Sequence, residues 1–499
     1  MRDIAGDNTH RRVEPPLPIR NRIIDRLDRR LVNLITVVGF AFPVVAYFWL
    51  IHLYSINVIF GDQWDDVTVI QHSYSHLFDW GSLWAQHNEN RIFFPNLIVV
   101  LLAHTAHFNI QAEEYLSAIM LIVATALLIW AHKRRSASTP WLYYIPVALL
   151  ALSTVQYENT LWGFQMAWYL VLVSLATAVV LVDRVTLTWL TLIGSIAAAV
   201  VGSFSSLQGL LIWPAGLVLL YHRRRPMRFV IVWVAAATVS VIIYFYHFNT
   251  SATSGSPSHG YALQHPLAAI KFYVFEVGDI VGLPRLYNGP GSNAVLLLGV
   301  VILVLAVLTL IACGIRRDEE GGGPVGVALI CVGLLFAGTV TVGRIRFGYL
   351  GASASRYTMY DLLIPIGIFM ALLGRPIVAK LPQHSHAPAA GEAARGDLRG
   401  RIGAGGPSWI NRTMLPATRW AIAGVIAVQI VFGLHYGPKG ARTDHAYQAQ
   451  AAHVLRNIDH TSDGTVGYYL YLLQSPSFIR RQARVVEMHH LSLFSPGSR

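Results

Sequence analysis

Charged residues are scarce in this chain of 499 residues. Asp, Glu, Lys and Arg together make up 13% of it, whereas 54% is hydrophobic and the mean hydropathy is +0.48. Soluble domains hold about 25% charged residues, so this composition excludes a soluble globular protein of this length. Apolar runs of roughly 17–25 residues recur, and each is long enough to cross the ~30 Å hydrocarbon core as a helix. The runs are continuous rather than alternating, which excludes a membrane β-barrel.

Cysteine and acidic residues are also few. The two cysteines, Cys313 and Cys331, lie inside apolar runs, which excludes a disulfide framework. With 26 acidic residues against 38 Lys and Arg, the net charge is +12. In a membrane protein such an excess belongs to the cytoplasmic loops that fix its orientation, so we expect no nucleic-acid partner. The first thirty residues are polar and rich in arginine, so we expect no cleavable signal peptide.

The apolar runs predict an all-α integral membrane protein with about eleven transmembrane helices. The predicted spans are residues 31–59, 114–131, 140–155, 165–182, 186–202, 207–221, 227–246, 293–315, 324–342, 359–375 and 417–435. The rest of the chain is expected to form a cytoplasmic tail at 1–30, a flexible cytoplasmic linker at 376–416 and a small outer tail at 436–499 with a helix at 444–457. Residues 31–375 would then be the main membrane region.

One further apolar segment, residues 92–110, decides the orientation of everything after it. If it crossed the membrane, the basic loops at 132–135, 222–228 and 316–317 would face outward and break the positive-inside rule. If it lies along the outer membrane surface, all three loops fall on the cytoplasmic side. The charge pattern therefore predicts a non-spanning helix within a first outer loop of residues 60–113, with the N-terminus inside and the C-terminus outside.

The outer face collects the unusual polar residues of the chain. Asp62, Asp65 and Asp66 follow the first span in a chain otherwise poor in acids. Ionisable groups close to the membrane are costly and usually functional, although Asp is also a common helix cap. Arginine presents a planar fork that matches phosphate oxygens. Three arginines precede the tenth span, in an outer loop of a kind usually poor in them: Arg344, Arg346 and Arg356.

Further polar and aromatic side chains on the same face fit a sugar-binding pocket. We assign ten residues to it: His87, Asn88, Glu89, Arg91, Gln156, Glu158, Asn159, Trp162, Gln165 and Tyr357. Each also has a structural interpretation, because helix caps, aromatic membrane belts and lipid-anchoring side chains use the same residue types.

This combination predicts glycosyl transfer from a sugar carried on a lipid phosphate. The reaction needs a base that takes the proton from the acceptor hydroxyl and cations that hold the departing phosphate. The acids after the first span supply the base, and the arginines before the tenth span supply the cations. A single carboxylate base in a direct displacement inverts the anomeric centre, by the logic of inverting glycosidases.

Residues 31–135 resemble the GT-C class of membrane glycosyltransferases, near the branch of protein O-mannosyltransferases and aminoarabinose transferases. In that class an acidic pair follows the first span, and a proline-led helix later in the same loop lies along the outer interface. Here the acids stand in FGDQWDD (60–66), and the helix starts at PNLIVVLLAHTAHFN (95–109). The resemblance implies a polyprenyl-phosphate-linked sugar donor, a glycan, lipid or protein acceptor, and an acid of the first outer loop as the base.

The family pair is usually two adjacent acids, which leaves the base open between Asp62, followed by Gln63, and Asp65, followed by Asp66. Some members also hold a divalent metal here, whereas the sequence itself requires no cofactor. The site is expected to face the outside of a bacterial plasma membrane, among membrane lipids. Two other interpretations stay open. One is a transporter or flippase of lipid-linked sugars, which would carry repeats and charged helices at mid-membrane, and the other is a non-catalytic scaffold with the same fold.

Overall fold

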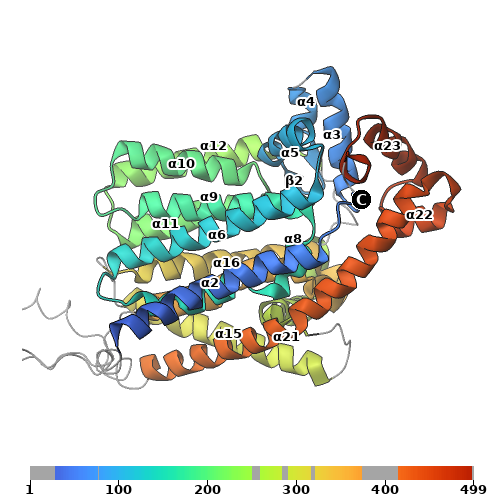
Figure 1. The fold of residues 1–499 in the computed structure, drawn as a ribbon. Helices are drawn as coiled ribbons and strands as arrows, with labels where there is room; N and C mark the ends of the chain where they lie inside the picture. The colour runs from blue at the N-terminus through green and yellow to red at the C-terminus, as the bar shows by residue number, and fades with distance from the viewer. Residues whose placement is uncertain are drawn as a thin grey trace, which may run out of the picture.

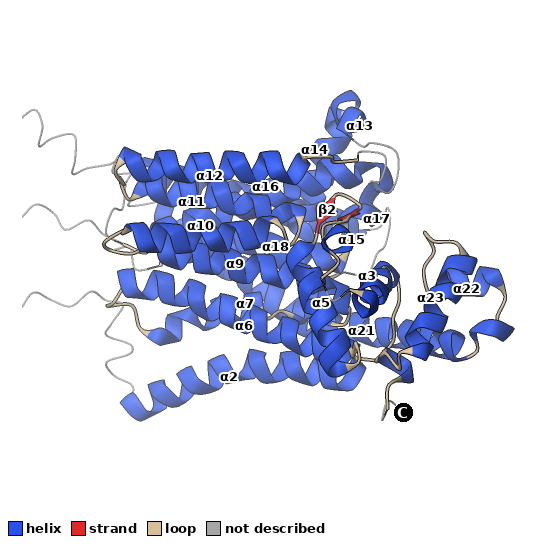
Figure 2. Ribbon diagram, turned by 90° about the horizontal axis from the view of Figure 1, so that it is seen from above, coloured by secondary structure: helices blue, strands red, loops and turns tan. Residues whose placement is uncertain are grey.

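The computed structural model describes residues 28–76, 78–249, 259–283, 290–315, 321–373 and 414–496. Nearly all of the regular structure in these ranges is helical, and the long helices run side by side in one bundle (Figures 1 and 2). This confirms the all-α fold. Most of the predicted N-terminal tail and nearly all of the predicted linker at 376–416 lie outside the described residues.

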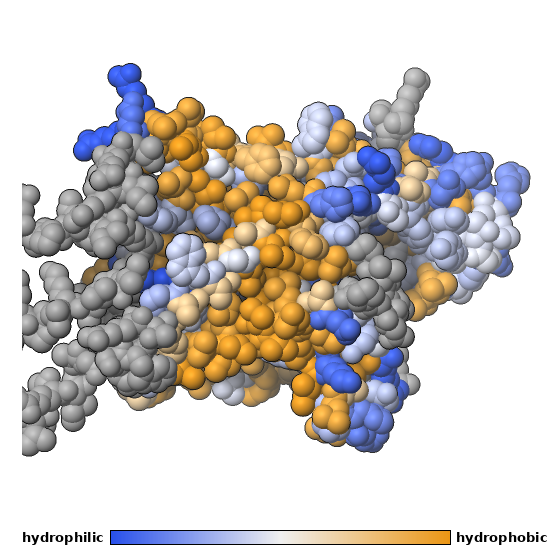
Figure 3. Space-filling model, turned by 90° about the horizontal axis from the view of Figure 1, so that it is seen from below, coloured by the Kyte–Doolittle hydropathy of each residue, from blue (hydrophilic) through white to orange (hydrophobic). Residues whose placement is uncertain are grey.

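Within the described ranges, seven helices are long and apolar enough to cross a membrane, in agreement with a multi-pass membrane protein. They are α2 (Arg29–Tyr54), α6 (Ile110–Arg135), η4 (Gly163–Gln165) with α9 (Met166–Val182), α12 (Met227–Phe245), α15 (Pro290–Ile315), α16 (Gly323–Arg344) with η8 (Ile345–Phe347), and α21 (Leu415–Arg456). Apolar side chains cover the middle of the bundle, whereas polar surface gathers at the end that carries the C-terminal helices (Figure 3).

The other four predicted spans coincide with shorter helices. These are η2 (Trp141–Tyr144) with α7 (Ile145–Ala151), α10 (Trp189–Ser203), η5 (Leu207–Leu211) with α11 (Ile212–His222), and α18 (Thr358–Asp361) with α19 (Leu363–Leu372). α19 is buried and packs on α16, whereas α10 packs on α9 and keeps one face exposed. Because a helix rises ~1.5 Å per residue, each is shorter than the ~30 Å core, and the full count of eleven spans stays a prediction.

The remaining elements are short and mostly connect these helices. They are η3 (Thr154–Gln156), α8 (Tyr157–Thr160), α13 (His259–Gln264), α14 (Pro266–Gly278), η7 (Asp279–Val281), α17 (Gly348–Ala352), η9 (Ser355–Tyr357), η11 (Ile458–His460) and η12 (Ser492–Phe494).

The loop between α2 and α6 forms a small structure of its own. It holds α3 (Gln63–Ser75), α4 (Trp80–Leu83), the strands β1 (Gln86–His87) and β2 (Asn90–Arg91), and α5 (Phe93–Ala106). The two strands form an antiparallel hairpin in which His87 pairs with Asn90. With 14 residues, α5 is about 21 Å long, too short to cross the membrane. It lies at one end of the bundle beside α3 (Figure 1), as expected for the non-spanning helix.

The last span differs from the prediction. The sequence predicts a span at 417–435 and a separate helix at 444–457, but α21 runs through both as one helix of 42 residues. Two glycines between them lie against other elements. A Cβ atom at Gly437 would stand 2.2 Å from Thr154 Oγ1, and one at Gly440 would stand 2.2 Å from the Tyr157 ring. This close packing on η3 and α8 stabilises the helix where glycine alone disfavours it.

The end of α21 and the following helices, α22 (Asp463–Tyr469) and α23 (Pro476–Met488), pack on the first outer loop. Their buried side chains form one hydrophobic cluster with α3 and α5, to which the tail contributes Leu455, Val466, Ile479 and Val486. Trp64 of α3 is fully buried in it. The outer tail and the first outer loop are therefore one packed unit, although they lie at opposite ends of the chain.

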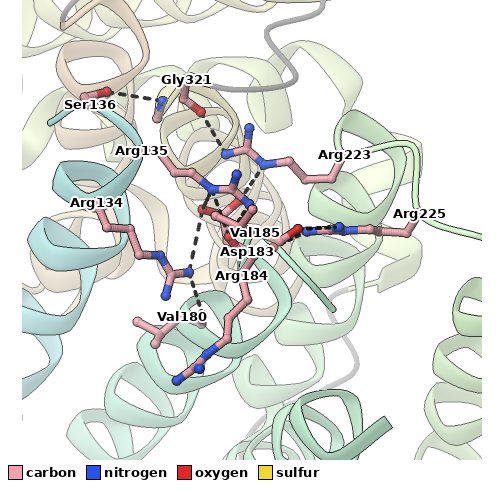
Figure 4. Close-up of polar contacts among 11 residues, drawn as sticks. Arg134, Arg135, Ser136, Val180, Asp183, Arg184, Val185, Arg223, Arg225 and Gly321 are labelled. Atoms are coloured by element: carbon pink, nitrogen blue, oxygen red, sulfur yellow. Dashed lines mark hydrogen bonds and ion pairs between the residues drawn. The ribbon is translucent and has the colours of Figure 1, made fainter. Parts of the chain in front are cut away.

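The opposite end of the bundle is tied together by arginines, and we call it the basic end. Asp183 is fully buried there. Its carboxylate lies 2.6 Å from Arg223 Nε, 3.5 Å from Arg135 Nε and 3.8 Å from Arg134 Nη2 (Figure 4). Arg223 also donates to the Gly321 carbonyl at 2.8 Å. The loops after α6, after α11 and before α16 therefore meet at one end, as expected if all three lie on the same side of the membrane.

Candidate functional site

The candidate site lies where the first outer loop, α8, η9 and the outer tail meet, and we call this the acidic end. Gly61 turns the chain from α2 into α3 with a φ of +61°, a conformation that favours glycine. A Cβ atom there would also stand 3.0 Å from the Trp162 ring. The Gly61 N–H donates to the Leu470 carbonyl at 2.6 Å. The turn thus fixes the place of Asp62 against the tail.

Asp62 stands directly before α3, yet it does not act as a helix cap. Among the described residues its side chain makes no capping hydrogen bond to α3. Instead its Oδ2 atom lies 3.5 Å from Nε2 of His87, on β1. The other ring nitrogen of His87, Nδ1, lies 3.3 Å from Asp65 Oδ2. A histidine with a carboxylate at each nitrogen is stabilised as the imidazolium, because both nitrogens must then donate. The side-chain nitrogen of Asn88 also lies beside this ring, 3.0 Å from Nε2.

The charges in this group separate the pKa values of its members. Burial alone lowers the pKa of His87, but the hydrogen bonds and charges of Asp62 and Asp65 raise it to about 10. Burial raises the pKa of Asp62, yet His87, with help from Tyr471 and Arg356, holds it below its ordinary value. Asp66 is buried, and burial raises its pKa to about 8. At neutral pH the site therefore holds an ionised Asp62, a charged His87 and a largely protonated Asp66.

The outer tail completes the surroundings of Asp65. The Tyr471 hydroxyl donates to Asp65 Oδ2, and the Gln474 amide donates to Asp65 Oδ1, both at 3.3 Å. With His87 on the same carboxylate, both oxygens of Asp65 have protein partners. Tyr471 and Gln474 were not among the predicted site residues. The signal for them was the aromatic patch 468–473 in a tail that is otherwise polar.

Arg356 reaches the site from η9 and is held by α8. Its Nη1 atom lies 3.5 Å from Glu158 Oε2, and its backbone N–H donates to the same oxygen at 3.3 Å. Glu158 N–H donates to Ser355 Oγ at 3.1 Å, and the Asn159 amide donates to the Arg356 carbonyl at 2.7 Å. The Arg356 side chain stays 34% exposed, and its charge lowers the pKa of Asp62. The structure thus brings an outer-loop arginine to the acids of the first loop.

The three remaining predicted site residues of the QYENTLWGFQ segment, 156–165, line or support this region in different ways. Trp162 is partly exposed and donates through Nε1 to the Phe60 carbonyl at 3.3 Å. Gln156 and Gln165 are buried, so they support the fold around the site rather than face its opening.

Other predicted site residues have protein partners of their own. Arg344 forms an ion pair with Glu89 at 2.7 Å, and Arg346 lies over the Tyr261 ring at 5.4 Å. Tyr357 is buried and stacks on Trp168.

Arg91 is also buried, and its guanidinium donates to four backbone carbonyls, of Trp84, Tyr244, Tyr246 and His247, at 2.9–3.4 Å. These contacts anchor the β-hairpin that carries His87. Arg91 therefore supports the site, and a contact with substrate is not needed to explain it.

Two buried acids behind the site were not predicted. Glu113 and Glu114 begin α6, and each is 1% exposed. Glu113 Oε2 accepts a hydrogen bond from Gln63 at 3.1 Å. The sequence feature that could have identified them is a pair of adjacent acids at the start of a membrane span. Their side chains give the site a polar inner wall. In the described part of the chain no group of three His, Cys, Asp or Glu is placed to hold a metal ion, and metal use stays an open prediction.

Comparison with known proteins gives no match, since neither a family model, nor a curated protein, nor a solved structure resembles this chain.

Proposed function

We propose that this protein is an integral membrane glycosyltransferase of the GT-C type. It would cross a bacterial plasma membrane eleven times and work on the extracytoplasmic face. There it would transfer a sugar from a polyprenyl phosphate to a hydroxyl group of a glycan, lipid or protein, with inversion at the anomeric carbon. The meeting of three basic loops at the far end of the bundle supports this orientation, because such loops stay in the cytoplasm.

One observation carries the proposal. Asp62 is a carboxylate that is 24% exposed, is held ionised by His87, and lies within the field of Arg356. The proposed base and the proposed phosphate-binding cation therefore interact electrostatically at one end of the bundle. This is the pair of groups that transfer from a phosphate carrier requires.

The reaction follows from these positions. Asp62 takes the proton of the acceptor hydroxyl, whose oxygen attacks the anomeric carbon from the side opposite the phosphate. The bond between that carbon and the phosphate oxygen breaks, and its electron pair leaves on the polyprenyl phosphate. Arg356 stabilises the charge that builds on the phosphate as it departs. His87, fixed by Asp65, keeps Asp62 ionised and oriented.

The surroundings favour Asp62 over the other two acids as the base. Both oxygens of Asp65 are occupied by His87, Tyr471 and Gln474. Asp66 is buried, and its raised pKa keeps it protonated at neutral pH. Asp65 is therefore an orienting group, and Asp66 belongs to the inner wall.

The test is a turnover assay on purified protein in lipid nanodiscs with a panel of polyprenyl-phosphate sugars. Asp62→Asn and Asp65→Asn would be compared with wild type, and Asp459→Asn, an exposed acid of the outer tail, would be the matched control. We expect Asp62→Asn to lose about 10²–10⁴-fold in kcat, the usual contribution of a general base, and Asp459→Asn to match wild type. Equal turnover in Asp62→Asn, or no donor consumed by wild type, would overturn the proposal.

A further inference from the structure

A continuous row of aromatic side chains leads away from His87 across the outer surface. The Phe164 ring centroid lies 4.9 Å from that of His87 and 5.6 Å from that of Trp162. Trp162 stacks on Phe60 at 5.6 Å, and Phe60 lies 6.2 Å from Tyr447. Tyr447 contacts two tail tyrosines at 6.2 and 5.5 Å. We call these six residues the aromatic strip: Phe164, Trp162, Phe60, Tyr447, Tyr468 and Tyr469.

The strip is open to solvent and held in place. All six side chains are at least partly exposed, and Tyr468 is 60% exposed. Trp162 is fixed by its hydrogen bond to the Phe60 carbonyl, and Tyr447 by a 2.7 Å hydrogen bond from its hydroxyl to the Tyr468 carbonyl. Contiguous exposed aromatic surface on a protein usually marks a binding site, and rings that are already fixed lose little entropy when a ligand binds.

An aromatic belt at the lipid headgroups is the structural alternative, and the position of the strip speaks against it. α21 has 42 residues and is about 63 Å long, twice the ~30 Å hydrocarbon core. Tyr447 lies twelve residues beyond the predicted span end at 435, or about 18 Å further along the helix. The end of the molecule that carries α21, α22 and α23 has a mostly polar surface (Figure 3).

We infer that the aromatic strip binds a carbohydrate chain, so that the acceptor is a glycan rather than a polypeptide or a simple lipid. Sugar rings have apolar faces that stack on aromatic rings and hydroxyl edges that need hydrogen-bond partners. The strip supplies the faces, and Asp62, beside His87 at its inner end, supplies a polar partner. The terminal sugar would present its hydroxyl to Asp62, and the chain would run outward to Tyr468. This inference rests on the proposed function, whose acceptor class it names.

The test is direct binding of defined sugars, which does not depend on turnover. Hexasaccharides of glucose, mannose and N-acetylglucosamine would be compared with the matching monosaccharides by saturation-transfer NMR on the full-length protein in nanodiscs. We expect at least one hexasaccharide to bind more tightly than its monosaccharide. Tyr447→Ala and Tyr468→Ala should each weaken that binding roughly 2- to 12-fold, the range for losing one stacking contact. Tyr436→Ala is the matched control, since Tyr436 lies on the same helix outside the strip.

The outcomes separate the two proposals. The strip is not a glycan site if no hexasaccharide binds more tightly than its monosaccharide. The same follows if Tyr436→Ala weakens hexasaccharide binding as much as Tyr447→Ala and Tyr468→Ala do. A nitroxide spin label can be attached to Tyr468→Cys. If its collision rate with oxygen dissolved in the lipid exceeds that with a water-soluble nickel complex, the strip is a membrane belt and the inference is overturned. Strip-dependent binding without sugar transfer would overturn the proposed function and leave the strip standing. Transfer without strip-dependent binding would do the reverse.

Discussion

The two ends of the bundle each hold a charged cluster, and the clusters are built in opposite ways. At the basic end three arginines share one carboxylate, Asp183, which is fully buried. At the acidic end two carboxylates share one imidazole, His87, and stay 24% and 30% exposed. The first cluster is closed by protein groups and holds helix ends together. The second is open on one side, which leaves the carboxylate of Asp62 partly exposed.

The largest contrast is expected between substitutions of Asp62, at the acidic end, and Asp183, at the basic end. Asp62→Asn should lower kcat by orders of magnitude and leave the unfolding temperature close to that of wild type, because a partly exposed amide is easily solvated. Turnover and thermal unfolding measured on the same nanodisc samples check both expectations. A large loss of stability in Asp62→Asn would mean that the acidic cluster, like the basic one, is structural.

Asp183→Asn should show the reverse pattern. Removing the shared carboxylate leaves the buried Arg223 and the half-buried Arg134 and Arg135 without their counter-charge, a change that costs about 3–5 kcal/mol in the free energy of unfolding. Turnover per folded molecule should stay close to wild type. Chemical denaturation measures the free energy of unfolding, and an activity assay on the fraction that remains folded measures turnover. Asp459→Asn controls for the loss of a single charge.

Arg356→Ala tests whether the acidic end holds a phosphate. Losing a group that stabilises the leaving phosphate should cost about 10²–10³-fold in kcat, and Arg356→Lys should recover only part of it because the fork is lost. Arg346→Ala, whose side chain lies over Tyr261, is the matched comparison. Equal losses in Arg346→Ala and Arg356→Ala would point to a general effect of positive charge on this face.

His87→Gln should shift the pH dependence of the reaction. His87 lowers the pKa of Asp62, so its loss raises that pKa and moves the acid limb of kcat/KM to higher pH. The contribution of His87 to the free energy of unfolding depends on pH in the opposite direction, because it is lost as the pH rises. The pKa of His87 rises from 6.5 to about 10 on folding, so its stabilising effect is full below pH 6.5 and disappears as the pH passes 10. The free energy of unfolding, measured at pH values from 6 to 10, should therefore decrease more steeply in wild type than in His87→Gln.

The smallest effect is expected for Tyr471→Phe. It removes one hydrogen bond to Asp65, worth ~1 kcal/mol, so kcat should fall about 5-fold with little change in the KM for the donor. A change in donor KM alone would show that Tyr471 contacts the donor instead of orienting Asp65. Tyr436→Phe, on the lower part of α21, should leave both constants unchanged.

Features that depend on local sequence were predicted well. Apolar length predicted the membrane helices, and the basic loops predicted that α5 lies along one end of the bundle, because loop charge and run length can be counted without knowing the fold. The prediction that Asp62 and Arg356 share one face agrees with the effect of Arg356 on the pKa of Asp62, whereas their roles stay predictions.

Features that depend on packing were not predicted. Gly437 and Gly440 stand inside α21 because Thr154 and Tyr157 lie against them, and nothing near them in the sequence shows this. Tyr471 contacts Asp65 across 406 positions. Arg91 has the same residue type as Arg356, but only the fold shows that backbone carbonyls around Tyr244 and Tyr246 occupy it.

The hydrogen bond from Gly61 to Leu470 also has a consequence for biosynthesis. A ribosome makes Asp65 406 residues before its partner Tyr471 and 409 residues before Gln474. The carboxylates therefore lack these partners until α21 and the segment that follows it have been made. A chain truncated before residue 470 would keep the bundle helices and Asp62, yet lack the groups that hold Asp65. The acidic cluster is therefore completed only after every described helix of the bundle has been made.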